Sequence, residues 1–236
     1  YDTALDYLNR SLKIFKEGGN KYEEGKTLNN ISQIYHARGD YETALDYLNR
    51  SLKISQEIGD KSGEGTTLNN ISQIFKARGD YDTALDYLNR SLKIFKEGGN
   101  KYEEGATLNN ISQIYDARGD YETALDYLNR SLKIRQEIGD KPGQCYTLHN
   151  IAMIEDARKN MEAVLALEME AYRLAMETSD AMGLFQVGKW LGQLLVGMGQ
   201  REEGTVILQR AFEIGRAAKL PGTEQIRDIL AQPGGS

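Results

Sequence analysis

Two kinds of apolar stripe with helical spacing alternate along the chain. One consists of Leu28, Ile31, Ile34 and Tyr35, and the next of Ala44, Leu45, Leu48, Leu52 and Ile54. Residues three and four positions apart lie on one face of an α-helix, so each stripe predicts an amphipathic helix. Every segment of about 40 residues therefore holds two helices.

Short turn motifs separate these stripes. Gly39-Asp40 provides a residue that tolerates positive φ and then a side chain that caps the next helix, and Gly59-Asp60 and Gly19-Asn20 do the same. The pattern predicts helices at 2–17, 21–38, 41–57, 61–78, 81–97, 101–118, 121–137, 141–157, 161–177, 181–198, 201–217 and 223–231.

The chain repeats itself with a period of 40 residues. A segment that starts Tyr-Asp/Glu-Thr-Ala-Leu-Asp-Tyr-Leu begins at residues 1, 41, 81 and 121. The segment 15–25 recurs without change at 95–105, so the copied unit was 80 residues long. Residues that recur in every copy therefore record duplication as well as any requirement of fold or function.

One helix pair cannot bury its own stripe, so neighbouring pairs must stack and share an elongated core. The pattern resembles the tetratricopeptide repeat family, whose bulky, small, aromatic and Gly-Asp-Tyr positions are filled here by Leu28, Ile31, Ser32, Tyr35, Gly39, Asp40, Tyr41, Ala44, Leu48 and Ser51. The 40-residue unit is similar to the long repeats of kinesin light chains and Pins-type adaptors. The resemblance implies an all-α fold, a right-handed superhelical solenoid of antiparallel helix pairs, with about five repeats and a C-terminal capping helix.

We expect a single solenoid over residues 1–231. Residues 1–20 would hold the second helix of a truncated repeat, and 21–60, 61–100, 101–140, 141–180 and 181–220 would be the repeats. The copies diverge after Lys141, and residues 223–231 would cap the stack through Ile226, Ile229 and Leu230. Because the chain starts within a repeat, we interpret it as part of a longer protein, with 232–236 as a linker or cloning remnant.

The composition narrows the classes of function. There are 29 Lys and Arg against 35 Asp and Glu, a net charge of −6, which is atypical of nucleic-acid binding. No apolar run approaches the roughly 18 residues of a membrane-spanning helix. One cysteine, Cys145, excludes an internal disulfide framework, so we expect a cytoplasmic protein.

The sequence offers little catalytic chemistry. Cys145 and His149 lie four residues apart, a spacing that suits a thiolate–imidazole pair or half a metal site. Neither an orienting third group nor further ligands accompany them, so we favour a packing role for Cys145 and an exposed ring for His149. We therefore predict no enzyme activity and no cofactor.

Asparagine pairs in the first helix of each repeat are more informative. Asn29-Asn30 and its copies place two poor helix formers inside a helix, at a cost of roughly 0.5 kcal/mol each. In long-repeat relatives the second Asn binds the backbone of an extended peptide, which implies such a ladder at Asn30, Asn70, Asn110 and Asn150, with Gln33, Gln73 and Gln113 on nearly the same face. The alternative is that each Asn bonds a neighbouring helix.

Charge on this face changes sign along the chain. Lys26, His36 and Lys76 come first, and Asp116, Glu155 and Asp156 follow, before the apolar Trp190. This predicts a ligand with an acidic part over the early repeats and a basic part over the later ones; the alternative is drift on a solvated surface.

We expect a module that binds an extended or helical peptide of a partner protein, without nucleic acid or membrane. One alternative is a regulatory arm of a larger enzyme or signalling protein. Another is a spacer that self-associates through its uncapped N-terminal end, where Leu5, Leu8 and Leu12 would be exposed.

Overall fold

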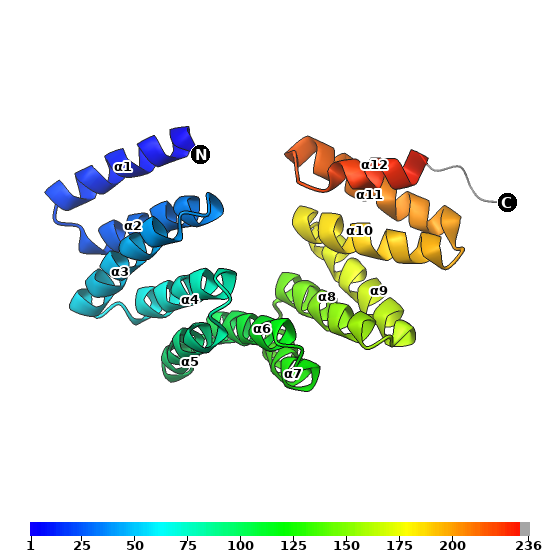
Figure 1. Cartoon of the computed structure of the whole chain (residues 1–236), viewed down its shortest axis with the longest axis horizontal. Helices are drawn as coiled ribbons and strands as arrows, with labels where there is room; N and C mark the ends of the chain where they lie inside the picture. Colours follow the sequence, from blue (N-terminus) through cyan, green and yellow to red (C-terminus); the bar gives the residue numbers. More distant parts are fainter. Residues whose placement is uncertain (232–236) are drawn as a thin grey trace. The chain divides into compact units, whose positions relative to one another are not determined.

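The computed structural model describes residues 1–231, and within them the chain is entirely helical (Figure 1). The elements are α1 (Asp2–Glu17), α2 (Lys21–Ala37), α3 (Tyr41–Ile58), α4 (Lys61–Ala77), α5 (Tyr81–Glu97), α6 (Lys101–Ala117), α7 (Tyr121–Glu137), α8 (Lys141–Ala157), α9 (Met161–Thr178), α10 (Ala181–Gly197), α11 (Arg201–Ala218) and α12 (Thr223–Ala231). The predicted helices are confirmed, and every end agrees to within one residue. The expected tail at 232–236 lies outside the described part.

The turn motifs explain this agreement, because they fix the helix ends locally. Gly39 adopts φ 76°, which a residue with a Cβ rarely takes. Oδ1 of Asp40 then accepts a hydrogen bond from the backbone N–H of Thr43 at 3.1 Å, which caps α3. In the diverged copies the left-handed position is occupied without glycine, at Lys159 (φ 62°), Ser179 (φ 52°) and Lys219 (φ 53°).

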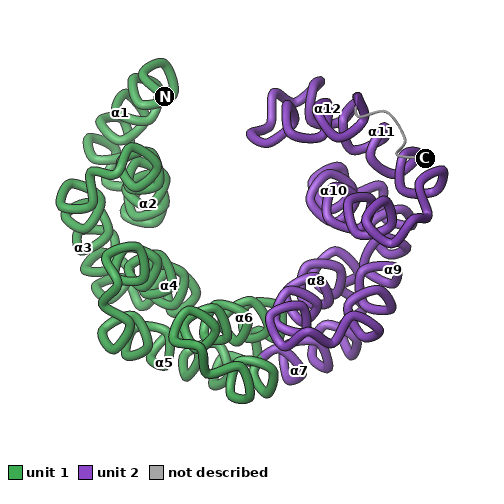
Figure 2. Tube along the Cα trace, turned by 45° about the vertical axis from the view of Figure 1, so that its right-hand side comes forward, with its two compact units in different colours: residues 1–127 green, residues 128–236 purple. Residues whose placement is uncertain are grey.

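The chain divides into two compact units, residues 1–127 and residues 128–236, and the boundary in the sequence falls within α7 (Figure 2). In the first unit, α2, α4 and α6 line one side of the stack, and α1, α3 and α5 line the other. In the second unit, α8 and α10 line one side, and α9 and α11 line the other. We call the side made by α2, α4 and α6, and by α8 and α10 in the second unit, the first-helix face.

The core of the first unit is a series of small apolar clusters between successive helices. Ala44, Leu48, Ile71 and Ile74 form one, with Tyr35, Phe75 and Tyr87 at its edge. The rings of Phe75 and Tyr87 are stacked, with centroids 5.6 Å apart. A helix pair thus shares its apolar stripe with the next pair, as the repeat pattern requires.

The second unit is closed at one end by α12. Ile226 is fully buried against a cluster that includes Phe185, Leu208 and Ala211, and Ile229 and Leu230 pack at the edge of that cluster.

The N-terminal helix differs from expectation. Leu12 is buried, and Leu5 and Leu8 are partly buried against α2 and its neighbours. The prediction that these three leucines form an exposed patch is therefore wrong, because their stripe faces α2. The exposed apolar residues of α1 are instead Tyr7 (62% exposed) and Ile14 (65%).

Candidate functional site

Two adjoining clefts lie on the first-helix face of the first unit. One has a volume of about 260 Å³ and is lined by Ser32, Gln33, His36, Leu48, Asn70, Gln73 and Ile74. The other, of about 270 Å³, is lined by Tyr22, Lys26, Asn29, Asn30, Gln33, Asp60, Ser62, Gly63, Thr66 and Asn70. Gln33 and Asn70 line both, so the structure brings six of the predicted site residues into one surface.

The first Asn of the first two pairs bonds to neighbouring helices within the stack. Nδ2 of Asn29 donates to Oγ of Ser51 at 2.8 Å and to Oγ1 of Thr67 at 2.7 Å, in the next repeat. Nδ2 of Asn69 donates to Oγ1 of Thr107 at 2.9 Å. These amides join one repeat to the next, the structural role that the sequence left open as an alternative.

The second Asn is more accessible, and its role differs between copies. The side chain of Asn30 is exposed on α2. Nδ2 of Asn70 donates to Oδ1 of Asn29 at 2.9 Å, while Asn70 also lines both clefts. Asn110 is partly buried on α6, in the same register. An amide that is held by one neighbour keeps its oxygen as an acceptor for a ligand.

Charged groups of this face have partners within the unit. Nζ of Lys76 donates to Oε1 of Gln113 on the next first helix, and burial of Lys76 lowers its pKa, opposed by nearby Asp116. Nζ of Lys26 lies 3.3 Å from Oε1 of Glu23. His36 packs its ring on Tyr41, with centroids 5.7 Å apart.

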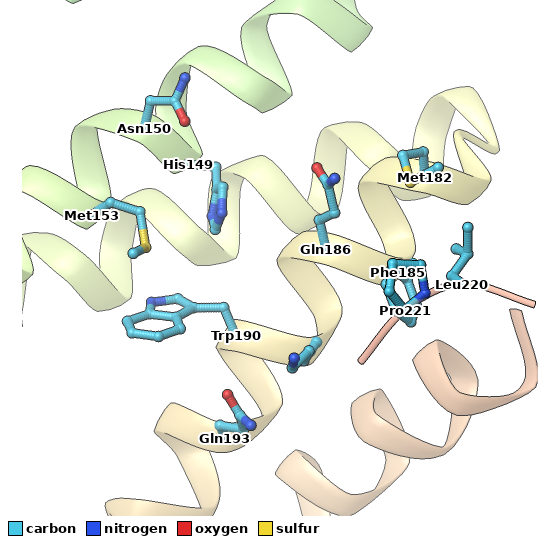
Figure 3. Close-up of a pocket in the computed structure, with 11 residues that line it drawn as sticks. His149, Asn150, Met153, Met182, Phe185, Gln186, Trp190, Gln193, Leu220 and Pro221 are labelled. Carbon is cyan, nitrogen blue, oxygen red and sulfur yellow. The ribbon is translucent and has the colours of Figure 1, made fainter. Parts of the chain in front are cut away.

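A cavity of about 590 Å³ lies on the first-helix face of the second unit. Side chains of α8 and α10 face one another across it, and the turn before α12 borders it (Figure 3). It is lined by His149, Asn150, Met153, Met182, Phe185, Gln186, Lys189, Trp190, Gln193, Leu220 and Pro221.

Repeat register relates this cavity to the clefts of the first unit. Asn150 and Trp190 stand at the positions of Asn30 and Asn70, and Gln193 stands at the position of Gln33. Nε1 of Trp190 is buried and has no hydrogen-bond partner within residues 1–231. The sequence reasoning placed Asn150 and Trp190 here but missed the methionines, because the earlier copies have glutamine at the position of Met153 and no methionine at that of Met182.

A buried ionisable pair borders the same cavity. Nδ1 of His149 lies 2.7 Å from Oε1 of Glu168, whose side chain is fully buried. Burial raises the pKa of Glu168, and the hydrogen bond to His149 opposes that rise. Oε2 of Glu168 has no hydrogen-bond partner within residues 1–231.

Glu168 was detectable in the sequence, although we did not single it out. Its position is leucine in all the other copies, at Leu8, Leu48, Leu88, Leu128 and Leu208. A carboxyl group in place of a core leucine breaks the apolar stripe.

The remaining candidate for chemistry, Cys145, is fully buried in an apolar cluster with Leu148, Ala171 and Val187. Burial raises the pKa of its thiol to about 12, so the reactive thiolate is scarce at neutral pH. Within residues 1–231, no three His, Cys, Asp or Glu side chains gather as a metal site would require. No helix in that range is long and apolar enough to cross a bilayer.

Comparison with known proteins agrees with the repeat geometry. The profile of the tetratricopeptide repeat family matches four overlapping stretches, residues 1–57, 23–97, 63–137 and 103–177. The chain belongs to the tetratricopeptide repeat family. A search of curated proteins found no significant match.

Solved structures share the fold at low sequence identity. BtubC from P. vanneervenii superposes with a TM-score of 0.70 at 14% identity, covering 100% of this chain and 94% of that one. The Rap conjugation gene regulator of plasmid pLS20, in complex with the Phr* peptide, gives 0.75 at 16% identity, covering 93% and 62%. Kinesin light chain TPR-like repeats of Podosopora anserina give 0.59 at 15% identity, covering 82% and 95%.

Proposed function

We propose that this chain binds a peptide segment of a partner protein along its first-helix face. The observation that carries the proposal is that each unit has its cleft at the same repeat register. Asn30 and Asn70 line the clefts of the first unit, and Asn150 and Trp190 line the cavity of the second.

The chemistry of these clefts suits a peptide. Amide side chains both donate and accept hydrogen bonds, so Asn30 and Gln33 can pair with main-chain groups of any sequence. The first-helix positions vary more after residue 141, which provides selection among ligand side chains. The family and the peptide complex of the Rap regulator described above support the same class of function.

The test is a proteome-wide peptide-display selection on the chain, repeated with Asn30→Ala and Gln33→Ala together. These side chains are exposed on α2 and have no part in the hydrogen bonds between repeats, so the fold is kept. We expect a common motif that weakens at least about tenfold in the variant. Asn49→Ala is the matched control, because Asn49 is also exposed but belongs to α3, a helix on the other side of the stack. Equal binding by both variants would refute the proposal.

We further propose that charge orients the ligand. Lys26, His36 and Lys76 precede Asp116 in the first unit, so an acidic part of the ligand would lie over α2 and α4. A basic part would follow towards Asp116. In the second unit, Asp156 would attract a basic segment, whereas Glu155 already accepts hydrogen bonds from Arg158 and Asn160. Exchanging the charges with Lys76→Asp and Asp116→Lys should change the salt dependence of binding. Unchanged affinity and salt dependence would remove this part of the proposal.

A second candidate function, self-association, has one supporting observation. Tyr7 and Ile14 expose large apolar side chains on α1, whereas their counterparts Tyr47 and Ile54 are covered by α2 or its neighbours. Sedimentation at rising concentration tests it, with Tyr7→Ser and Ile14→Ser together as the variant. A mass that is constant and monomeric would exclude it.

A further inference from the structure

The cavity of the second unit is lined by two side chains whose N–H groups suit an oxygen atom of a ligand. We propose that His149 and Trp190 offer two N–H donors there, and that the cavity binds an oxygen acceptor next to an apolar side chain of the ligand. This inference rests on the proposed peptide binding and specifies what the second unit recognises.

The first donor is the indole of Trp190. Its Nε1–H is buried without an acceptor within residues 1–231, and a buried donor without a partner is destabilising until a ligand supplies one. Figure 3 shows the nitrogen-bearing edge of this indole on the side where Met153 lies. Met153 is 39% exposed and its side chain is flexible, so it can move aside for a ligand atom.

The second donor follows from the His149–Glu168 pair. In the first unit, Asn29 occupies the position of His149 and is held by Ser51 and Thr67. In the second unit those two partners are replaced by Ala171 and Val187. His149 therefore has Glu168, and not a hydroxyl group, as the partner that fixes its ring.

The number of protons that His149 and Glu168 share decides whether the outer ring nitrogen, Nε2, carries one. Glu168 is fully buried, so a pair with zero net charge is favoured over a bare carboxylate. That pair is either a carboxylate with an imidazolium or a carboxyl group with a neutral imidazole. A carboxyl proton on Oε2 is disfavoured, because Oε2 is buried and no acceptor lies within hydrogen-bond distance among residues 1–231. In both cases, therefore, one proton lies between Oε1 and Nδ1 and the other is on Nε2. His149 lines the cavity, and its Nε2 is thus a hydrogen-bond donor there.

Other ionisable groups near the pair do not alter this count. Cys145, one turn earlier on α8, is held as a neutral thiol because burial raises its pKa. Asp180, before α10, acts on Cys145 and Tyr146. Lys189 of α10 donates to Oε1 of Gln225 on α12 at 2.6 Å.

The walls of the cavity define the rest of the ligand. Met153, Met182 and Phe185 provide an adaptable apolar lining beside the two donors. The acceptor is a main-chain carbonyl or a carboxylate, since both carry oxygen lone pairs that N–H donors recognise.

Two probes distinguish these acceptors: N-acetyl-methionine N-methylamide, which is neutral, and N-acetyl-methionine, which has a carboxylate. The chain has one Trp and two His, so ¹⁵N spectra of a His36→Gln background report on Trp190 and His149 alone. We expect Nε2 of His149 to carry a proton at pH 7 and the indole N–H signal of Trp190 to shift when a probe is added. The probe with the larger shift identifies the acceptor.

Two variants test the donors. Trp190→Phe keeps an aromatic ring and removes the N–H. His149→Leu with Glu168→Leu removes the second donor without leaving a buried charge. Each should weaken probe binding about three- to tenfold. A Nε2 without a proton at pH 7, or a Trp190→Phe variant that binds both probes as the natural chain does, would overturn the inference.

The two proposals fail separately. If the display selection returns no peptide but the probes behave as expected, the proposal of peptide binding is refuted and the assignment of the two donors is supported. If peptides bind through Asn30 but Nε2 of His149 has no proton, the inference about the donors is refuted and the proposed function is supported.

Discussion

Nδ2 of Asn70 donates a hydrogen bond to Oδ1 of Asn29 at 2.9 Å, from one repeat to the one before it. Asn29 in turn donates to Thr67, on the same helix as Asn70. Asn29 and Asn70 therefore take part in two hydrogen bonds that join α2 to α4. The adjacent residue Asn30 takes no part in them and is exposed.

This relationship predicts opposite effects for two neighbouring substitutions. Asn29→Ala should lower the free energy of unfolding by about 1–3 kcal/mol, because it leaves Ser51 and Thr67 without their donor. Asn30→Ala should be neutral or stabilising by up to about 0.5 kcal/mol, because alanine is the better helix former. Urea denaturation followed by circular dichroism measures both. Similar losses for both variants would mean that Asn30 is also structural.

Two glycines at the same repeat position should respond differently to alanine. A Cβ on Gly65 would lie 2.6 Å from Cζ of the fully buried Phe95, whereas one on Gly25 would meet its nearest atom, Cγ2 of Ile54, at 3.5 Å. We expect Gly65→Ala to destabilise by about 1–3 kcal/mol through overpacking. Gly25→Ala should instead stabilise by about 0.5–1 kcal/mol through helix propensity. Thermal denaturation of both variants checks this, and a stabilised Gly65→Ala would show that Phe95 can move.

The turn after α8 contains removable strain. Lys159 adopts φ 62°, where its counterparts Gly39, Gly79 and Gly119 lie at φ 76°. Lys159→Gly should raise the free energy of unfolding by up to about 1 kcal/mol, since the left-handed conformation costs a residue with a Cβ roughly 1–2 kcal/mol. Gly119→Ala should show the reverse effect in the same urea titration. A loss of stability in Lys159→Gly would contradict this account.

The buried carboxyl group predicts a pH dependence of stability. The pKa of Glu168 is raised in the folded state. This group therefore favours folding most at a pH below its pKa in the unfolded chain, about 4.5. That contribution is lost as the pH rises through the folded-state pKa. His149→Leu with Glu168→Leu should therefore be more stable than the natural chain by about 1–4 kcal/mol at pH 8, and by less at pH 5. Urea titrations at the two pH values measure the difference, and an equal gain at both would contradict the raised pKa.

The helices and their ends were predictable because they depend on residues close together in the sequence. The spacing of Leu28, Ile31 and Ile34 defines one helical face, and Gly39-Asp40 ends one helix and caps the next within four residues. The 40-residue period was likewise sufficient for the family, since a lone helix pair cannot bury its own stripe.

The site depended on contacts that the repeat pattern does not encode. Asn29 and Asn30 are identical and adjacent, and only the packing of α2 against α4 commits one to the stack and exposes the other. His149 and Glu168 lie 19 residues apart and become partners because α8 and α9 pack together. The sequence by itself determined the secondary structure and the stacking, which follow from local periodicity and turn chemistry. The tertiary structure alone decided which polar groups form hydrogen bonds between repeats and which face a cleft. This division depends on distances between helices that are far apart in the chain.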